Sequence, residues 1–210
     1  PSFWHGALVV SALIGTVIGS LLFGKPADRY GRRAILKVLG VLYFVSAVGS
    51  AWAWGAISFS IFRFIGGLAV GGASVISPMY IAEISPARVR GRLVAITQFN
   101  IVLGILLAYL SNWGISILNL GGVEWRWMFG VEAFPAAVFF VALYFIPRSP
   151  RWLMAQNIPD EARSVLEIVG TDTGNIDEEL IAIRQSLLEH AASLKEPFFQ
   201  GKYLRPIMLA

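Results

Sequence analysis

Long apolar blocks dominate the first two thirds of the chain, and short stretches that carry most of the charge separate them. The blocks run over residues 3–24, 35–56, 58–82, 93–117 and 128–146. A bilayer core of about 30 Å is crossed by a helix of about 20 apolar residues, and five such helices in succession cannot all be buried in a small soluble domain. The pattern therefore predicts an all-α polytopic membrane protein with five spans in residues 1–147.

The pattern changes after the fifth block. Residues 148–200 are polar and contain helix breakers, and residues 160–169 and 176–193 each have the amphipathic pattern of a helix with acidic residues in its first turn. We expect these residues to form a helical linker against one membrane face. A further apolar run near Leu204 predicts that another span begins in residues 201–210.

Charge sets the orientation. The chain is 56% hydrophobic and only 14% charged, with a net charge of +4, and its basic residues cluster after the first, third and fifth blocks. Because Lys and Arg mark cytoplasmic loops, the side of residue 1 should be extracellular or periplasmic, and residues 148–200 should be cytoplasmic. The basic excess is a topology signal and does not indicate a nucleic-acid partner. Tryptophans at the predicted outer ends are typical of an interfacial belt: Trp4, Trp52, Trp54, Trp113, Trp125 and Trp127.

Small residues and prolines occur inside the predicted spans. Gly15 and Gly19, like Gly67 and Gly71, form small-xxx-small patterns that let helices approach closely. These faces either pack permanently or slide past each other during a conformational cycle. Pro78 and Pro135 lie within two spans and should bend them.

Two ionisable residues, Arg63 and Glu132, fall inside apolar blocks. A charge at the centre of a span costs about 2.5–3.5 kcal/mol on insertion scales, so such residues face the interior and find partners. Both lie at similar depth from the predicted outer surface, which suggests one buried polar cluster. Either the two form a fixed structural ion pair, or their protonation changes during a transport cycle.

Gln98 and Asn100 place amides at the start of the fourth block. An amide both donates and accepts hydrogen bonds, which suits a polyhydroxylated ligand or an interhelical contact. Ile101 and Ile105 follow Gln98 at helical spacing and share its face.

Several motifs occur in a fixed order. Residues 24–33 read GKPADRYGRR, residues 63–71 read RFIGGLAVG, residues 78–91 read PMYIAEISPARVRG, and residues 147–153 read PRSPRWL. Together they resemble the sugar porter family of the major facilitator superfamily, most closely its bacterial xylose–proton symporters. The resemblance runs over nearly the whole chain.

The resemblance implies a major facilitator fold of twelve helices in two halves, of which this chain supplies helices two to six, the linker and the start of helix seven. Helix one and the C-terminal half would be its partners. It also implies uptake of a monosaccharide, a pentose or a hexose, across the plasma or inner membrane, with a proton as coupling ion and with no metal or cofactor. Gln98, Ile101 and Ile105 match sugar-binding positions, and Arg63 and Glu132 match the proton-coupling region. The residues matching a cytoplasmic gate of salt bridges are Asp28, Arg32, Arg33, Glu83, Arg90 and Arg151.

Two residues depart from the family pattern. Arg148 stands where the family usually has a glutamate, and Ile105 stands where the xylose symporters carry a polar side chain. The first removes an acid from the gate, and the second removes a sugar contact.

Other functions stay open. A facilitative uniporter or a transporter-like sugar sensor would share most of these motifs. A drug–proton antiporter is disfavoured because residues 98–108 contain no proline, and a membrane enzyme because the only histidines, His5 and His190, are far apart.

Overall fold

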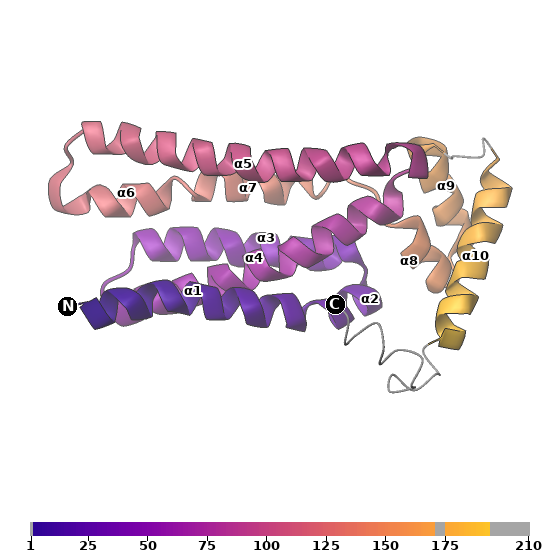
Figure 1. Ribbon diagram of the computed structural model, residues 1–210, viewed down its shortest axis with the longest axis horizontal. Helices are drawn as coiled ribbons and strands as arrows, with labels where there is room; N and C mark the ends of the chain where they lie inside the picture. The colour runs from indigo at the N-terminus through magenta and orange to yellow at the C-terminus, as the bar shows by residue number, and fades with distance from the viewer. Residues whose placement is uncertain (1, 171–174, 194–210) are drawn as a thin grey trace, which may run out of the picture.

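The computed structural model describes the backbone of residues 2–170 and 175–193, all of it helices and their connections. The predicted span beginning in residues 201–210 lies outside the described residues. Four long helices, α1 (Ser2–Leu22), α3 (Arg32–Ala51), α4 (Ala56–Ile84) and α5 (Ala87–Ile117), run along the length of the molecule (Figure 1). The elements agree closely with four of the five predicted apolar blocks.

Three described helices are long and apolar enough to cross a membrane: Arg32–Ala51, Ala56–Ile84 and Gly91–Ile117. The number rises to four if α1 and the short helix α2 (Gly24–Tyr30), which is bent from it by 44°, form one span. α2 occupies most of the motif predicted as the first charged loop. Gly31, at φ +92°, makes the turn from α2 into α3, a backbone conformation that favours glycine.

The fifth predicted span is broken into two helices, α6 (Glu124–Gly130) and α7 (Ala133–Ala142), which follow the 3₁₀ turn η1 (Gly121–Val123). The break falls at residues 131–132, just before Pro135. Because proline has no N–H, the carbonyl of Val131 accepts a hydrogen bond from the amide of Phe134 instead. The predicted disruption at Pro135 is confirmed, whereas α4 continues without a break through Pro78.

The two glycine patterns meet each other. α1 and α4 pack so closely that a Cβ on any of four glycines would overlap a backbone oxygen of the facing helix. The pairs are Gly15 with Phe64, Gly19 with Leu68, Gly67 with Ala12, and Gly71 with Thr16. The small-xxx-small prediction of close approach is thus confirmed, and each pattern is the other's partner.

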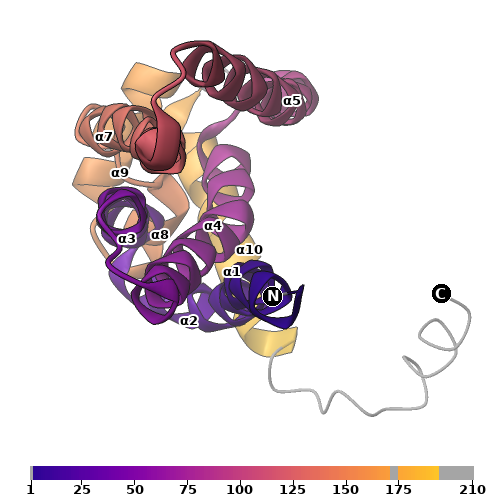
Figure 2. The same cartoon turned by 90° about the vertical axis from the view of Figure 1, so that its left-hand side faces the viewer.

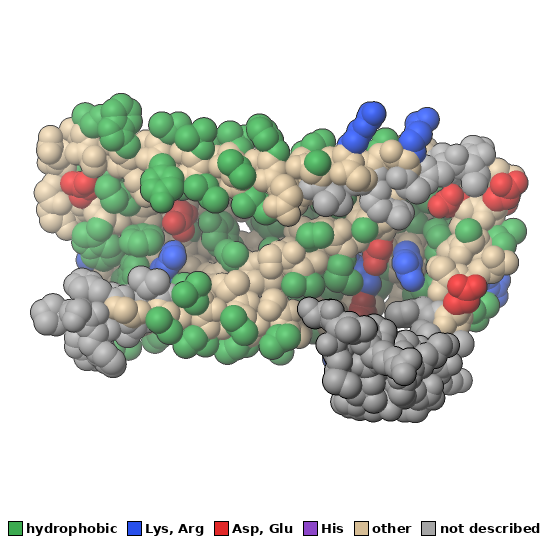
Figure 3. Space-filling model, viewed as in Figure 1, with side chains coloured by type: hydrophobic (Ala, Val, Ile, Leu, Met, Phe, Trp, Pro, Cys, Tyr) green, Lys and Arg blue, Asp and Glu red, His purple; other side chains and the backbone are tan. Residues whose placement is uncertain are grey.

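The buried core lies at one end of the bundle, where α2, α3, α4 and α7 meet. Its members are small and branched apolar side chains together with one tyrosine: Ala27, Ile35, Leu36, Leu39, Ile76, Tyr80 and Leu143. Elsewhere large apolar side chains cover the outer surface (Figure 3), as lipid contact requires. α5 is exposed over most of its length and stands away from α1 (Figure 2).

Three further helices, α8 (Pro150–Ala155), α9 (Pro159–Val169) and α10 (Ile176–Ser193), gather at the same end as α2 (Figure 1). Leu153, Ala162 and Val165 form a small core between α8 and α9. α9 and α10 are the two amphipathic helices predicted from the sequence. The opposite end carries the exposed tryptophans Trp52, Trp54, Trp113 and Trp127.

Candidate functional site

A cavity of about 650 Å³ opens between α3, α4, α5 and α7. This volume is within the range of about 300–1,000 Å³ that is typical of small-molecule sites. Gln98 and Ile101 of α5, two of the three residues that the family resemblance matches to sugar-binding positions, line it. Ile105 lies one turn further along α5, is exposed, and does not line this cavity.

The cavity also has hydroxyl groups that the sequence reasoning missed: Tyr43, Ser74, Ser77 and Thr97. Ser74 and Thr97 each donate to a carbonyl of their own helix, Gly71 O at 2.8 Å and Leu93 O at 3.0 Å. Their oxygens keep lone pairs that can accept hydrogen bonds. The signal was available, because Val70, Ser74 and Ser77 recur at the spacing of one helix face.

Arg63 and Glu132 lie together near the opposite end of the bundle from α8. Nη1 of Arg63 is 3.8 Å from Oε2 of Glu132, and the guanidinium stands 5.3 Å from the centre of the Phe129 ring. Glu132 lies at the break between α6 and α7. The expected pairing is present, but the cluster is not fully buried in this chain, since the side chains are 32% and 37% exposed.

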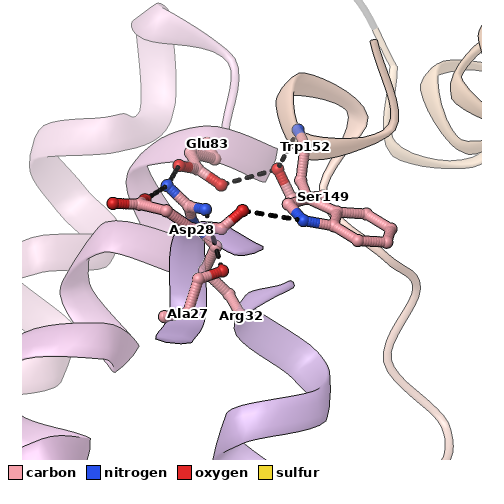
Figure 4. A network of polar contacts seen from close by, with 6 residues as sticks. All are labelled: Ala27, Asp28, Arg32, Glu83, Ser149 and Trp152. Atoms are coloured by element: carbon pink, nitrogen blue, oxygen red, sulfur yellow. Dashed lines mark hydrogen bonds and ion pairs between the residues drawn. The ribbon is translucent and has the colours of Figure 1, made fainter. Parts of the chain in front are cut away.

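A polar network joins α2, α3, α4 and α8 at the other end (Figure 4). Nη2 of Arg32 lies 2.6 Å from Oδ1 of Asp28 and 2.9 Å from Oε1 of Glu83, while Nη1 donates to Ala27 O at 3.0 Å. Arg32 and Glu83 are each only 11% exposed, whereas Asp28 is 63% exposed. The buried pair is therefore Arg32–Glu83.

Ser149 extends this network to α8. Its hydroxyl donates to Oε2 of Glu83 at 2.6 Å and accepts the amide of Trp152 at 3.2 Å, which caps the helix. The indole of Trp152 donates to Asp28 O at 3.1 Å and packs on Gly31. Sequence reasoning missed both residues, although a serine before Pro150 is a typical N-cap signal.

The other residues expected in the gate lie elsewhere. Arg33 donates to the carbonyls of Leu143 at 3.1 Å and Tyr144 at 2.6 Å, so it binds the C-terminal end of α7, where cations are favourable. Arg151 forms no ion pair with any residue that the structure describes, and the side chain of Arg90 lies outside the described residues.

Arg148, the departure from the family pattern, lies 3.1 Å from Oε2 of Glu161 on α9. The acid lost at position 148 is thus not replaced within the network of Arg32 and Glu83.

At one end of the helical bundle a polar network thus joins four motif residues, Asp28, Arg32, Glu83 and Ser149. A mostly apolar cavity with a few polar side chains lies between α3, α4, α5 and α7. The family model described as sugar (and other) transporter matches residues 1–210. The chain belongs to this sugar transporter family. The alternative of a membrane enzyme is thereby set aside, because the family and the relatives below are transporters.

The chain is similar to several characterised transporters. It is 43% identical over 192 residues to the D-xylose-proton symporter of Escherichia coli K12, covering 80% of this chain and 39% of that protein. It is 38% identical over 208 residues to the D-xylose transporter of Levilactobacillus brevis, covering 98% and 44%. It is also 40% identical over 191 residues to the glucose transport protein of Synechocystis, covering 86% and 41%. The chain therefore spans less than half the length of these relatives.

Solved structures agree. The proton:xylose symporter XylE, of the major facilitator superfamily, bound to 6-bromo-6-deoxy-D-glucose, superposes with a TM-score of 0.82 at 39% identity, over 89% of this chain and 44% of that one. The inward-open XylE of Escherichia coli gives 0.79 at 40% identity, over 88% and 46%. The fold is that of the major facilitator superfamily, a polytopic membrane protein.

Proposed function

We propose that the transporter containing this chain carries a monosaccharide across a cell membrane by alternating access. The observation that carries the proposal is the cavity between α3, α4, α5 and α7, lined by Gln98 and several hydroxyl side chains. It occurs in a chain that the sugar transporter family matches from end to end. Relatives named for xylose and for glucose support a pentose or a hexose as the cargo.

The cavity residues have separate roles in this proposal. The amide of Gln98 hydrogen-bonds sugar hydroxyls, and Ile101 packs against the apolar face of the ring. Ile105 contacts the sugar only after the rest of the transporter completes the site, because here it lies outside the cavity. The missing helix and the C-terminal half close the other side.

The network of Arg32, Glu83 and Ser149 acts as the cytoplasmic gate. It joins α3, α4 and the start of α8 while this end is closed, and it must separate for the end to open. In this orientation residue 1 lies on the extracellular or periplasmic side and residues 148–200 on the cytoplasmic side. The exposed tryptophans at the far end support this orientation.

Proton symport is the second part of the proposal. The pair of Arg63 and Glu132 supports it, because protonation of a carboxylate next to a guanidinium changes the attraction between α4 and the α6–α7 break. A facilitative uniporter would keep this pair as a fixed ion pair, and a sugar sensor would bind its ligand without moving it.

Uptake by the full-length protein in vesicles tests both parts. A panel of radiolabelled pentoses and hexoses should show saturable uptake of at least one sugar, and an inward proton gradient should drive accumulation above equilibrium. Glu132→Gln should abolish accumulation while leaving exchange of sugar across the membrane. Uptake of no sugar would overturn the transport proposal, and uptake indifferent to the gradient would overturn only the coupling.

A further inference from the structure

A second cavity, of about 160 Å³, lies at the end of the bundle where α3 begins and α8 packs. The turn at Gly31, the first residues of α3 and the start of α8 line it. It is separate from the sugar cavity and shares with the gate only residues at its edge, Arg32, Ser149 and Trp152.

Four cationic side chains line this cavity. Arg32 is already paired with Asp28 and Glu83, and the other three are Arg33, Lys37 and Arg148. Arg33 donates to neutral carbonyls, and the ammonium of Lys37 stands 3.8 Å from the centre of the Tyr144 ring. Neither forms an ion pair with a carboxylate among the residues that the structure describes. Arg148 pairs with Glu161, but both side chains are about half exposed, so that pair is weak.

The backbone adds to the positive field. α3 has twenty residues, and no side chain caps its N-terminus at Gly31. The first amide groups of a helix have no intrahelical acceptor, and the helix dipole favours an anion there. The cavity thus combines a helix N-terminus with two cations that have no carboxylate partner among the described residues and a third, Arg148, that is only weakly paired, a combination that suits phosphate.

The surface beside the cavity is apolar. Val38 and Val41 of α3 are exposed next to Lys37, and Tyr144 and Phe145 are exposed after α7. A free anion gains nothing from such a surface, whereas an acyl chain does. This continuity of a cationic cavity with an apolar helical surface indicates a phospholipid.

We propose that Arg33, Lys37 and Arg148 bind the phosphate of an anionic phospholipid headgroup at this end of the bundle. The proposal requires that the chain spans a membrane, but it does not depend on which sugar is carried. Arg148 is essential to it, because a glutamate at that position would face the same cavity and repel the phosphate.

Native mass spectrometry of the full-length protein in detergent measures the binding directly. Phosphatidylglycerol should bind more tightly than phosphatidylcholine with the same acyl chains. Lys37→Gln with Arg148→Gln should weaken phosphatidylglycerol binding by about thirtyfold, since each cation near an anionic lipid contributes about fivefold. Arg148→Glu alone should weaken it further than Arg148→Gln.

The matched control is Lys25→Gln with Arg184→Gln, which removes the same charges from exposed positions of α2 and α10 outside the cavity. It should leave the affinity within about twofold of the parent, as surface charges distant from a site do. Equal losses in the two double variants would overturn the proposal, because binding would then follow net charge.

Competition with inorganic phosphate distinguishes a phospholipid headgroup from a soluble phosphate as the ligand of this cavity. Millimolar phosphate should compete only weakly with phosphatidylglycerol if the acyl chain contributes to binding. Strong competition, with no preference for phosphatidylglycerol over phosphatidylcholine, would show a site for a soluble anion and overturn the lipid. Arg33 is left unchanged throughout, because it also binds the end of α7 and its loss would disturb the fold.

Discussion

At the scale of single residues, two features of the structure should tolerate almost no substitution: the close packing of α1 against α4, and the buried ion pair of Arg32. Gly67 and Gly71 leave no room for a side chain against α1, and Glu83 is the buried acid that faces Arg32. Adding an atom to a closely packed backbone contact lowers the stability of the protein. Removing one charge of a buried ion pair also lowers it, because the other charge is left buried without a partner. The same substitution should therefore have a different effect on stability at an exposed position than at these sites.

Gly67→Ala should destabilise the protein by about 1–3 kcal/mol, because its Cβ would overlap the carbonyl oxygen of Ala12 and push α1 from α4. Gly104→Ala, on the open surface of α5, should stabilise it slightly, because alanine favours a helix by about 1 kcal/mol over glycine. Thermal unfolding of the full-length protein in detergent measures both. Equal shifts in the two variants would show that α1 and α4 can move apart freely.

Glu83→Gln should lower stability by up to about 3 kcal/mol, because it leaves the buried guanidinium of Arg32 with only an exposed acid. Asp28→Asn removes the same charge from a mostly exposed position and should cost less than about 1 kcal/mol. The difference in unfolding temperature between the two variants is the measurement. A larger effect for Asp28→Asn would mean that the wrong carboxylate has been assigned to the gate.

At the scale of elements, the break between α6 and α7 is the main irregularity of the bundle. It divides residues 124–142 into two helices, and Glu132, which pairs with Arg63, lies at the break. The proline that follows supplies the cause, since it cannot donate to the carbonyl of Val131. The missing backbone N–H of Pro135 thus accounts for the break at which Glu132, a residue of the candidate coupling site, lies.

Pro135→Ala restores that amide and should join α6 to α7. Hydrogen exchange of residues 131–136 in the full-length protein should slow by about tenfold, which corresponds to one added helical hydrogen bond of about 1 kcal/mol or slightly more. Pro78→Ala, in the uninterrupted α4, is the control and should leave exchange at residues 131–136 unchanged. Unchanged exchange in Pro135→Ala would place the cause of the break in the pairing of Glu132.

At the scale of the whole molecule, α5 is the element that the chain leaves least supported. Its cavity face holds Gln98 and Ile101, and the remaining faces are open. The chain covers 44% of the major facilitator structure on which it superposes, and it spans less than half of its relatives. We propose that residues outside this chain complete the sugar site.

Cysteine labelling of the full-length protein tests which residues of α5 contact the sugar. In full-length protein freed of other cysteines, a thiol reagent should modify Gln98→Cys, and the transported sugar should reduce the rate about fivefold or more once the site is nearly occupied. Leu106→Cys, exposed on α5 outside the cavity, is the control and should label at the same rate with and without sugar. Protection at Ile105→Cys would show that the other half brings the sugar to this residue. Protection at neither Gln98 nor Ile105 would contradict the cavity as the binding site.

Much of this protein follows from the sequence alone. The spacing of apolar residues is sufficient to place the long helices, because a membrane-spanning helix satisfies its own backbone hydrogen bonds and needs only length and apolarity. The order of the motifs was sufficient for the family. The glycine patterns indicated close approach, and the depth of Arg63 and Glu132 indicated their pairing.

Only the tertiary structure decided which helices pack against each other, because a glycine pattern predicts close packing but does not identify the partner helix. It paired the glycines of α1 with those of α4, placed Arg33 at the end of α7, and brought Ser149 and Trp152 into the polar network of Arg32 and Glu83. It also left Ile105 outside the cavity that Gln98 lines. These contacts join residues distant in the chain, and their geometry depends on how whole helices pack, which local pattern does not determine.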